Sequence, residues 1–246
     1  MRVLVTGGAG FIGSHLTRHL VEEGYDVVVF DNLTRSSYAI ANGSSFVKGD
    51  LRCISVIQRA LKGVDIVYHL AALIDVRESV EKPKLYHRVN VEGTLNLLEC
   101  CRKVNVKKVI YLSSCAVYGE PVRLPVSEDH PTNPLSPYAA SKLAGEAYCR
   151  SYSICYGMNV LIFRLFNVYG PRQSDGYAGV ISEFVKRVKN GKAPVIYGSG
   201  EQLRDFIHID DVVECLVKAL SFEDRFEVFN LGSGRGVKIR ELADLV

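Results

Sequence analysis

The chain has 246 residues, of which 48% are hydrophobic and 23% are charged, and its formal net charge at pH 7 is +3. These values are typical of a soluble globular protein and argue against disorder, a coiled coil and collagen-like repeats. The basic and acidic residues form no block of like charge, so we expect neither a nucleic-acid nor a membrane partner. No apolar run approaches the roughly 20 residues of a membrane span, and a glycine turn follows the first residues directly, so we expect no signal peptide.

Short β-rich segments alternate with segments of helical periodicity along most of the chain. Several of the β-rich segments are continuous apolar runs, as expected for strands that are buried on both faces. The predicted strands cover residues 3–6, 26–31, 45–48, 65–70, 108–113, 160–166 and 228–231. The predicted helices between them cover residues 12–23, 54–61, 91–104 and 138–156. This alternation predicts an α/β fold of the Rossmann type, a doubly wound parallel sheet with helices on both faces.

The later part of the chain departs from this alternation. Five of the eight prolines fall within residues 119–137, which have the composition of a loop. We predict that residues 1–168 form a dinucleotide-binding Rossmann domain and that residues 169–246, which include a helical stretch at 180–189, form a smaller, partly interwoven substrate-binding lobe. The amphipathic pattern of residues 240–246 ends without a helix stop signal, so we expect the natural lobe to extend further.

The first predicted strand and the first predicted helix are joined by a Gly-x-x-Gly-x-x-Gly motif, formed by Gly7, Gly10 and Gly13. These glycines permit a tight turn, let backbone amides approach a pyrophosphate and allow the helix to pack closely on the strand. The spacing alone is a weak signal, because glycine turns also occur without a ligand. Its position before an amphipathic helix, whose N-terminus favours an anion, predicts a dinucleotide site.

Acidic residues follow the second and third predicted strands. A carboxylate at Asp31 can bind the ribose hydroxyls of adenosine and repels a 2′-phosphate, so we expect NAD rather than NADP. The alternative is an ordinary strand-end aspartate that caps a turn, and the nearby Arg35 could weaken the discrimination against a phosphate. Asp50 and Leu51 are placed to flank an adenine.

Tyr138 and Lys142 are four residues apart and therefore lie on one face of a predicted helix. Ser136 and Pro137 supply an N-cap and a proline at the first helical position, which places Tyr138 in the first turn. There the helix dipole and the Lys142 ammonium favour the phenolate, so we expect a lowered pKa and a tyrosine that acts as a proton acceptor. On an unrelated helix the same pair would be a packed tyrosine beside a solvated lysine.

Two serines, Ser113 and Ser114, end the fifth predicted strand. A serine there can hold a substrate hydroxyl and share its proton, although both hydroxyls could instead satisfy backbone groups at the strand end. Cys115 follows, but no histidine is adjacent in sequence to activate a thiol nucleophile. The seven cysteines form no Cys-x-x-Cys pair and have no histidines at ligand spacing, so we expect no metal site, no disulfide framework and a reducing, cytoplasmic location.

Together these motifs resemble the extended short-chain dehydrogenases/reductases, and within them the UDP-glucose 4-epimerase-like group of NAD-dependent epimerases and dehydratases. The resemblance covers essentially the whole chain. It rests further on His-Leu-Ala-Ala at 69–72, Asn-Val-Glu-Gly-Thr at 90–94, Arg-Leu-Phe-Asn-Val-Tyr-Gly-Pro-Arg at 164–172 and Arg-Asp-Phe-Ile-His-Ile-Asp-Asp at 204–211. It implies a Rossmann fold, NAD as the cofactor and a UDP-sugar as the substrate.

The resemblance also implies a set of site residues. The catalytic residues are Ser114, Tyr138 and Lys142. The cofactor residues are Gly7, Gly10, Phe11, Ile12, Gly13, Asp31, Asn32, Asp50, Leu51, Leu70, Ala71, Ala72, Asn90, Tyr138, Lys142 and Phe166. The substrate residues are Ser114, Asn167, Val180, Tyr197 and Arg204. A guanidinium such as that of Arg204 suits a diphosphate, and it would otherwise be an ordinary surface charge.

The implied reaction is a 4-epimerisation of UDP-glucose and UDP-galactose through a transient 4-keto sugar. The Tyr138 phenolate, assisted by Ser114, would take the proton of the sugar C4 hydroxyl while hydride passes to NAD and then returns to the other face. The alternatives are a dehydratase, decarboxylase or reductase of the same family and a non-catalytic dinucleotide-binding regulator. A regulator would not need the serine, tyrosine and lysine together.

Two departures from the family pattern bear on these alternatives. The family's dehydratases carry an acidic residue after the catalytic hydroxyl residue, where this chain has Cys115 and Ala116. The family's epimerases typically carry a lysine where this chain has Leu73 and Ile74.

The resemblance further implies a homodimer that pairs through the two long helices at residues 91–104 and 138–156. Family members usually continue several tens of residues beyond this length, with a segment that helps to close the sugar pocket. We therefore expect the 246-residue chain to retain NAD but to bind a UDP-sugar weakly.

Overall fold

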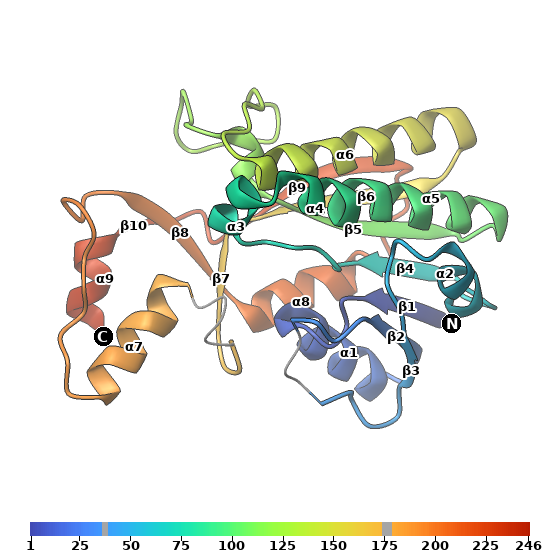
Figure 1. Ribbon diagram of the computed structural model, residues 1–246, viewed down its shortest axis with the longest axis horizontal. Helices are drawn as coiled ribbons and strands as arrows, with labels where there is room; N and C mark the ends of the chain where they lie inside the picture. Colours follow the sequence, from blue (N-terminus) through green and yellow to red (C-terminus); the bar gives the residue numbers. More distant parts are fainter. Residues whose placement is uncertain (36–38, 174–178) are drawn as a thin grey trace.

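The computed structural model describes residues 1–35, 39–173 and 179–246 and contains a seven-stranded sheet between two layers of helices (Figure 1). Its strands are β1 (Arg2–Thr6), β2 (Asp26–Asp31), β3 (Ser45–Lys48), β4 (Ile66–His69), β5 (Lys108–Ser114), β6 (Asn159–Leu165) and β9 (Phe226–Leu231). Their order is β3-β2-β1-β4-β5-β6-β9, and each neighbouring pair is parallel. The predicted Rossmann-type fold is confirmed. The order reverses between β1 and β4, where such sheets bind ligands beyond the strand carboxyl ends.

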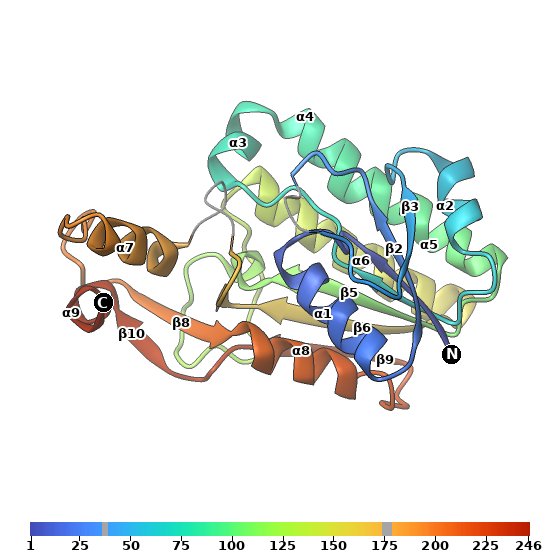
Figure 2. The same ribbon diagram turned by 90° about the horizontal axis from the view of Figure 1, so that it is seen from below.

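Helices cover both faces of this sheet. On one face α1 (Phe11–Glu22) and α8 (Ile209–Lys218) lie side by side, below the sheet in Figure 1 and nearest the viewer in Figure 2. The other face is covered by α2 (Ile54–Ala60), α5 (Gly93–Lys103) and α6 (Pro137–Tyr156). Successive residues of a strand point to opposite faces. In β1, Leu4 accordingly packs in the core beneath α5 and α6, whereas Val3 and Val5 pack against α1 and α8.

Short helical pieces separate β4 from α5 and follow β5. They are α3 (Val76–Glu81), α4 (Pro83–Tyr86), the π-helical segment η1 (His87–Glu92) and the 3₁₀ helix η2 (Cys115–Tyr118). The predicted helix at 91–104 is therefore α-helical only from Gly93, because the preceding segment has π-helical hydrogen bonding. Single π-helical turns of this kind recur at functional sites.

The smaller lobe is built on a three-stranded sheet with its own small core. Its elements are β7 (Asn167–Tyr169), α7 (Val180–Lys189), β8 (Leu203–His208), β10 (Gly236–Lys238) and α9 (Ile239–Leu245). β8 pairs parallel with β7 and antiparallel with β10. The lobe and the C-terminus lie at the opposite end of the molecule from the N-terminus (Figure 1). Since α8 and β9 also follow residue 168 but belong to the large layers, the lobe is interwoven with the Rossmann part, and the boundary at 168 stays a proposal.

A buried ion pair fixes α6 against the sheet. The Nη2 and Nε groups of Arg164 on β6 donate to the two carboxylate oxygens of Glu146 at 2.7 and 3.1 Å. Ser113 also donates to this carboxylate, at 2.5 Å, and Nη1 of Arg164 donates to the Tyr118 hydroxyl at 2.8 Å. The side chains of both ion-pair residues are less than 10% exposed, so removing one partner would leave a buried charge without compensation.

We expect Glu146→Leu to lower the free energy of unfolding by about 3–5 kcal/mol, because the Arg164 guanidinium then remains buried without its carboxylate. Urea denaturation followed by far-ultraviolet circular dichroism measures this loss. The double variant Glu146→Leu/Arg164→Met should recover most of it, since no buried charge remains. A single variant as stable as the wild type would show that the ion pair does not hold α6.

Candidate active site

A cleft of about 390 Å³ lies beyond the carboxyl ends of β1, β2, β4 and β5, between the glycine turn and the first turns of α6. All three predicted catalytic residues, Ser114, Tyr138 and Lys142, line it. The other predicted cofactor residues that line it are Gly7, Gly10, Phe11, Ile12, Gly13, Asp31, Asn32, Asp50, Leu51, Leu70, Ala71, Ala72 and Phe166. The sheet thus brings residues more than 150 positions apart in sequence into one cavity.

The glycine turn forms one wall of this cleft and fits a pyrophosphate. Gly7 has a φ of +70°, and a Cβ at Gly13 would lie 2.2 Å from the Gly7 carbonyl oxygen, so both positions require glycine. α1 begins at Phe11 after Gly10, which has no side chain to cap the first backbone amides. A helix N-terminus with free amides and a favourable dipole is suited to an anion, here the diphosphate of a dinucleotide.

Asp31 stands where the glycine turn meets the end of β2. One carboxylate oxygen accepts the Ala9 backbone amide at 3.1 Å and the other accepts the Leu33 amide at 2.8 Å. Asp31 therefore caps the turn after β2, which is the alternative role that the sequence allowed for it. It also lines the cleft. The Asp31 carboxylate thus lies at the end of β2, where a ribose binds in this fold.

Asp50 and Asn32 meet at the same end of the cleft. The Asn32 amide donates to Asp50 at 3.2 Å, and the Arg52 guanidinium donates to both Asp50 oxygens at 2.8 and 2.6 Å. The hydrogen bonds from Arg52 hold the pKa of Asp50 well below its usual range. Asp50 is therefore an ionised acceptor at neutral pH.

Asn90 holds the loop after β4 against α6. Its side chain pairs with both the amide (2.8 Å) and the carbonyl (2.9 Å) of Leu73, and it donates to the Ser141 hydroxyl at 2.9 Å. Among the described residues it does not line the cleft, so its contact with NAD stays a prediction. The structure shows a positioning role, because Leu70, Ala71 and Ala72 in the cleft wall belong to this loop.

A neutral histidine ties the strand ends together beneath that loop. His69 Nδ1 lies 2.8 Å from the Thr6 hydroxyl, and Nε2 lies 2.9 Å from the Thr94 hydroxyl. Burial, together with the charge of Lys142, lowers the pKa of His69 to about 3. Because Thr94 donates to the Asn90 carbonyl at 2.6 Å, its oxygen is free to accept from Nε2. We therefore assign the His69 proton to Nε2.

Tyr138 and Lys142 are positioned by the start of α6. As predicted, Ser136 is the N-cap, accepting the Ala139 amide at 3.1 Å, and Pro137 is the first helical residue. Burial raises the pKa of Tyr138 to about 12, and a hydrogen bond with Ser114 acts in the opposite direction. Burial lowers the pKa of Lys142 to about 8. The expected lowering of the Tyr138 pKa is therefore wrong, because the cost of burying a phenolate outweighs the favourable contacts.

The remaining predicted substrate residues lie in the lobe or at its start. Asn167 donates to the Asp205 carbonyl at 2.8 Å and so joins β7 to β8. Arg204 is exposed and donates to the Leu203 carbonyl, Tyr197 is 82% exposed, and Val180 begins α7. Within the described part of the chain, none of these four lines the cleft, and their contact with a substrate stays a prediction.

Two ion pairs at the site were not found by sequence reasoning. Glu146 is four residues beyond Lys142, so it lies on the same face of α6, but this spacing does not indicate its buried pair with Arg164 on β6. Arg35 forms an ion pair with Glu78 of α3. These partners are 43 positions apart, and no local pattern joins them.

All seven cysteines are free thiols. In residues 1–35, 39–173 and 179–246, no group of three or more His, Cys, Asp or Glu side chains could hold a metal ion. Of the helices that the structure describes, none is long and apolar enough to cross a membrane.

The fold and cleft define a dinucleotide-binding protein with a serine, a tyrosine and a lysine at the reacting end of the site. The sequence profile of the NAD dependent epimerase/dehydratase family matches residues 3–232. The chain therefore belongs to this family, and its cofactor is NAD. The glycine turn and the strand-end carboxylate fit that cofactor on geometric grounds as well.

Named relatives share most of their length with the chain. A putative UDP-glucose 4-epimerase of Methanocaldococcus jannaschii is 45% identical over 99% of this chain and 81% of its own length. The crystal structure of UDP-glucose 4-epimerase from Thermotoga maritima with UDP-glucose superposes with a TM-score of 0.96 at 39% identity, covering 100% of this chain and 81% of that one.

Other similar proteins act on different nucleotide sugars. A UDP-N-acetylglucosamine 4-epimerase from Methanobrevibacter ruminantium, solved with UDP-N-acetylmuramic acid, has a TM-score of 0.94 at 38% identity, covering 99% of this chain and 80% of that one. A UDP-N-acetyl-alpha-D-glucosaminuronate decarboxylase of Bacillus cytotoxicus is 36% identical over 98% of this chain and 78% of its own length. These similarities therefore show the enzyme family of the chain, but they do not single out one reaction within that family.

In protein stripped of nucleotide, we expect Tyr138 to keep its proton up to about pH 10, because burial raises its pKa to about 12. An exposed tyrosine, with a pKa of about 10, has lost half of its protons there. Ultraviolet difference absorbance should therefore give the same titration for the wild type and Tyr138→Phe up to about pH 10. One additional ionising tyrosine in the wild type below that pH would contradict the assignment.

Proposed function

We propose that the protein is an NAD-dependent 4-epimerase that interconverts UDP-glucose and UDP-galactose through a transient 4-keto sugar. The observation that carries the proposal is the convergence of Ser114, Tyr138 and Lys142 with the glycine turn in one cleft. The named UDP-glucose 4-epimerases among the relatives support the substrate. In the same proposal the protein works in the cytoplasm, where its seven free cysteines stay reduced.

The chemistry needs a base at Tyr138, whose pKa in the protein is about 12. When bound, oxidised NAD supplies the hydride acceptor. Ser114, which lines the cleft with Tyr138, would hold the sugar C4 hydroxyl and share its proton. Lys142 is mostly charged at pH 7, since its pKa is about 8. It lines the same cleft as Tyr138, where a positive charge would favour the phenolate over the phenol. The proton can move from the sugar hydroxyl to Tyr138 only when Tyr138 is a phenolate, which is the minor form of the nucleotide-free protein at neutral pH. A positive charge brought by bound NAD would raise the share of the phenolate.

Dehydration is the second candidate, and Cys115 counts against it. The residue after Ser114 would have to act as an acid, but burial raises the pKa of the Cys115 thiol to about 11. A thiol with that pKa gives up its proton poorly at neutral pH.

Product analysis tests the proposed reaction directly. Purified protein with bound NAD should convert UDP-glucose to UDP-galactose without added reductant, and conversion should also run in reverse. Formation of a 4-keto-6-deoxy sugar would identify a dehydratase instead. Stoichiometric consumption of NADH would identify a reductase, and conversion of only the N-acetylated sugar would overturn the proposed substrate.

We expect Tyr138→Phe to lower epimerisation by about 10²–10⁴-fold while NAD stays bound, because the ring still packs but the proton acceptor is lost. Turnover and the NAD released on denaturation are the two measurements. Tyr152→Phe is the matched control, since Tyr152 is also buried on α6 but its hydroxyl contacts Glu99 rather than the cleft. Equal activity of the two variants would remove Tyr138 from the mechanism.

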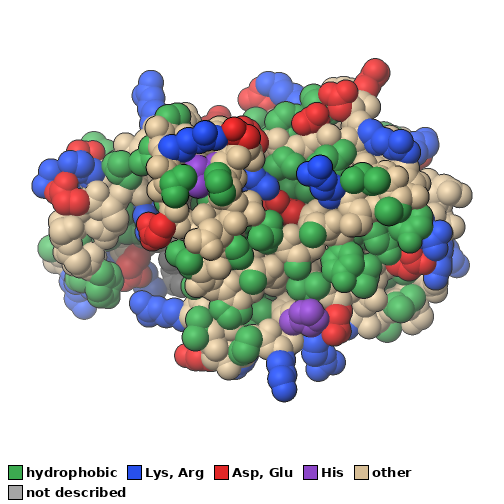
Figure 3. All heavy atoms as spheres, turned by 90° about the horizontal axis from the view of Figure 1, so that it is seen from above, with side chains coloured by type: hydrophobic (Ala, Val, Ile, Leu, Met, Phe, Trp, Pro, Cys, Tyr) green, Lys and Arg blue, Asp and Glu red, His purple; other side chains and the backbone are tan. Residues whose placement is uncertain are grey.

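We also propose a homodimer that pairs through α5 and α6. Apolar side chains on or next to these helices are exposed: Val104, Tyr148, Ile154 and Tyr156. Seen from above this layer, hydrophobic side chains lie among charged ones (Figure 3). Light scattering over a concentration series should give twice the chain mass, and Ile154→Lys, at a side chain that is 70% exposed, should shift it towards the monomer. A monomer at all concentrations of the wild type would refute the dimer.

A further inference from the structure

An ion pair links the loop after β2 to α3, beside the cleft. Arg35 lines the cleft with Asp31 and Asn32. Its Nη2 group donates to the two carboxylate oxygens of Glu78 at 2.7 and 2.6 Å. Because Glu78 belongs to the segment that follows β4, the pair joins two strand ends on either side of β1.

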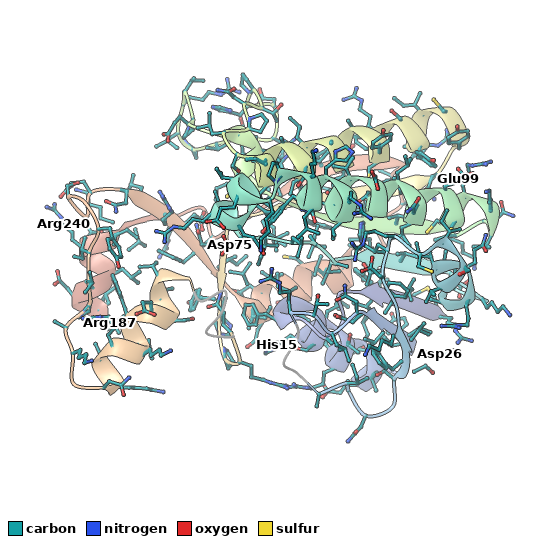
Figure 4. All side chains as sticks on the ribbon, viewed as in Figure 1. His15, Asp26, Asp75, Glu99, Arg187 and Arg240 are labelled. Carbon is teal, nitrogen blue, oxygen red and sulfur yellow. The ribbon has the colours of Figure 1, made fainter. Side chains whose placement is uncertain are left out.

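Glu78 is held in place by its own helix. Its backbone amide donates to the Asp75 cap at 2.8 Å, and Figure 4 labels Asp75 at the start of α3. Lys82 and the Tyr86 hydroxyl donate to its carboxylate at 3.1 and 3.2 Å. The Glu78 side chain is 15% exposed, whereas that of Arg35 is 45% exposed. Glu78 is therefore the fixed partner, and Arg35 is the side chain that reaches towards it.

The pair matters because Asp31 and Arg35 favour different cofactors. A carboxylate at the end of β2 binds the ribose 2′-hydroxyl of NAD, whereas an arginine nearby accommodates the 2′-phosphate of NADP. With both in the lining of the cleft, the sequence alone leaves the discrimination open. The Glu78 pair bears on this choice, because a guanidinium that is bound by a carboxylate is already compensated.

We propose that Glu78 is a specificity-determining residue for the cofactor: by binding Arg35 it prevents the guanidinium from receiving a 2′-phosphate and so favours NAD over NADP. Hydrogen bonds from Arg35 and Lys82 also lower the pKa of the Glu78 carboxyl, so its charge is present at neutral pH. The inference concerns the cofactor and is independent of the sugar substrate.

Calorimetry of NAD and NADP binding to nucleotide-stripped protein at low salt tests this inference. Glu78→Gln keeps the size and polarity of the side chain but removes its charge. We expect NADP to bind about tenfold more tightly to this variant, as one recovered charge-assisted hydrogen bond allows, with the NAD affinity unchanged within about twofold. Glu81→Gln is the matched control, because Glu81 is an exposed residue of the same helix, and we expect it to leave both affinities unchanged.

A second variant assigns the effect to the guanidinium. In Glu78→Gln/Arg35→Gln the gain in NADP affinity should disappear, and in Glu78→Gln it should shrink as salt is added. An unchanged NADP affinity in Glu78→Gln would overturn the proposal. An equal loss of NAD and NADP affinity would also overturn it, since that result means that the pair only holds α3. These binding measurements do not depend on which sugar the protein converts.

Discussion

The position of α6 on the sheet is the constraint on which the rest of the site depends. The buried Glu146–Arg164 pair holds α6 against β6, and the first turns of this helix carry Tyr138 and Lys142 into the lining of the cleft. Asn90 reinforces the arrangement from the other side, since it joins Ser141 of α6 to the loop after β4. A pair of hydrophobic residues would stabilise the interface as well or better. A bidentate, hydrogen-bonded pair also fixes the direction and register of the helix, which a catalytic side chain requires.

The electrostatics of the cleft oppose folding. Lys142 has a pKa of about 8 in the folded protein against 10.5 for an exposed lysine, which corresponds to a cost of about 3 kcal/mol for keeping the ammonium charged. Because the folded pKa is the lower one, this cost is fully present below about pH 8 and disappears as the pH rises past that of the unfolded chain. Burial keeps His69 neutral, and the same ammonium adds to this effect. The buried charge of Lys142 therefore does not contribute to stability at neutral pH.

Local patterns in the sequence predicted the elements that build the cofactor site. The strand before Gly7, the helix after Gly10 and the cap of α6 at Ser136 are where the pattern placed them. The helix α8 was missed, although its buried residues Ile209, Val212, Val213 and Leu216 have helical spacing. The glycine-rich turns around it made that part of the chain resemble a series of short strands.

What local patterns could not provide was burial depth and distant pairing. The direction of the Tyr138 pKa shift depends on how deeply the fold buries the phenol. The spacing of Tyr138 and Lys142 on a helix does not predict that burial. Arg35 and Glu78 meet only because β1 lies between β2 and β4. Sequence reasoning therefore identified the groups at the site, but it predicted the wrong direction for the Tyr138 pKa shift and missed Glu78 as the partner of Arg35.

The dinucleotide cleft and the smaller lobe are determined to different degrees by the fold. The dinucleotide half consists of backbone turns and strand-end carboxylates, so it is fixed wherever this sheet forms. Among the residues that the structure describes, the lobe's own core cluster contains three buried side chains, those of Phe184, Ile239 and Leu242. Relatives of 36–45% identity are similar over nearly the whole chain yet are named for different nucleotide sugars. NAD binding follows from the architecture, whereas one architecture can serve different substrates through different side chains at its site.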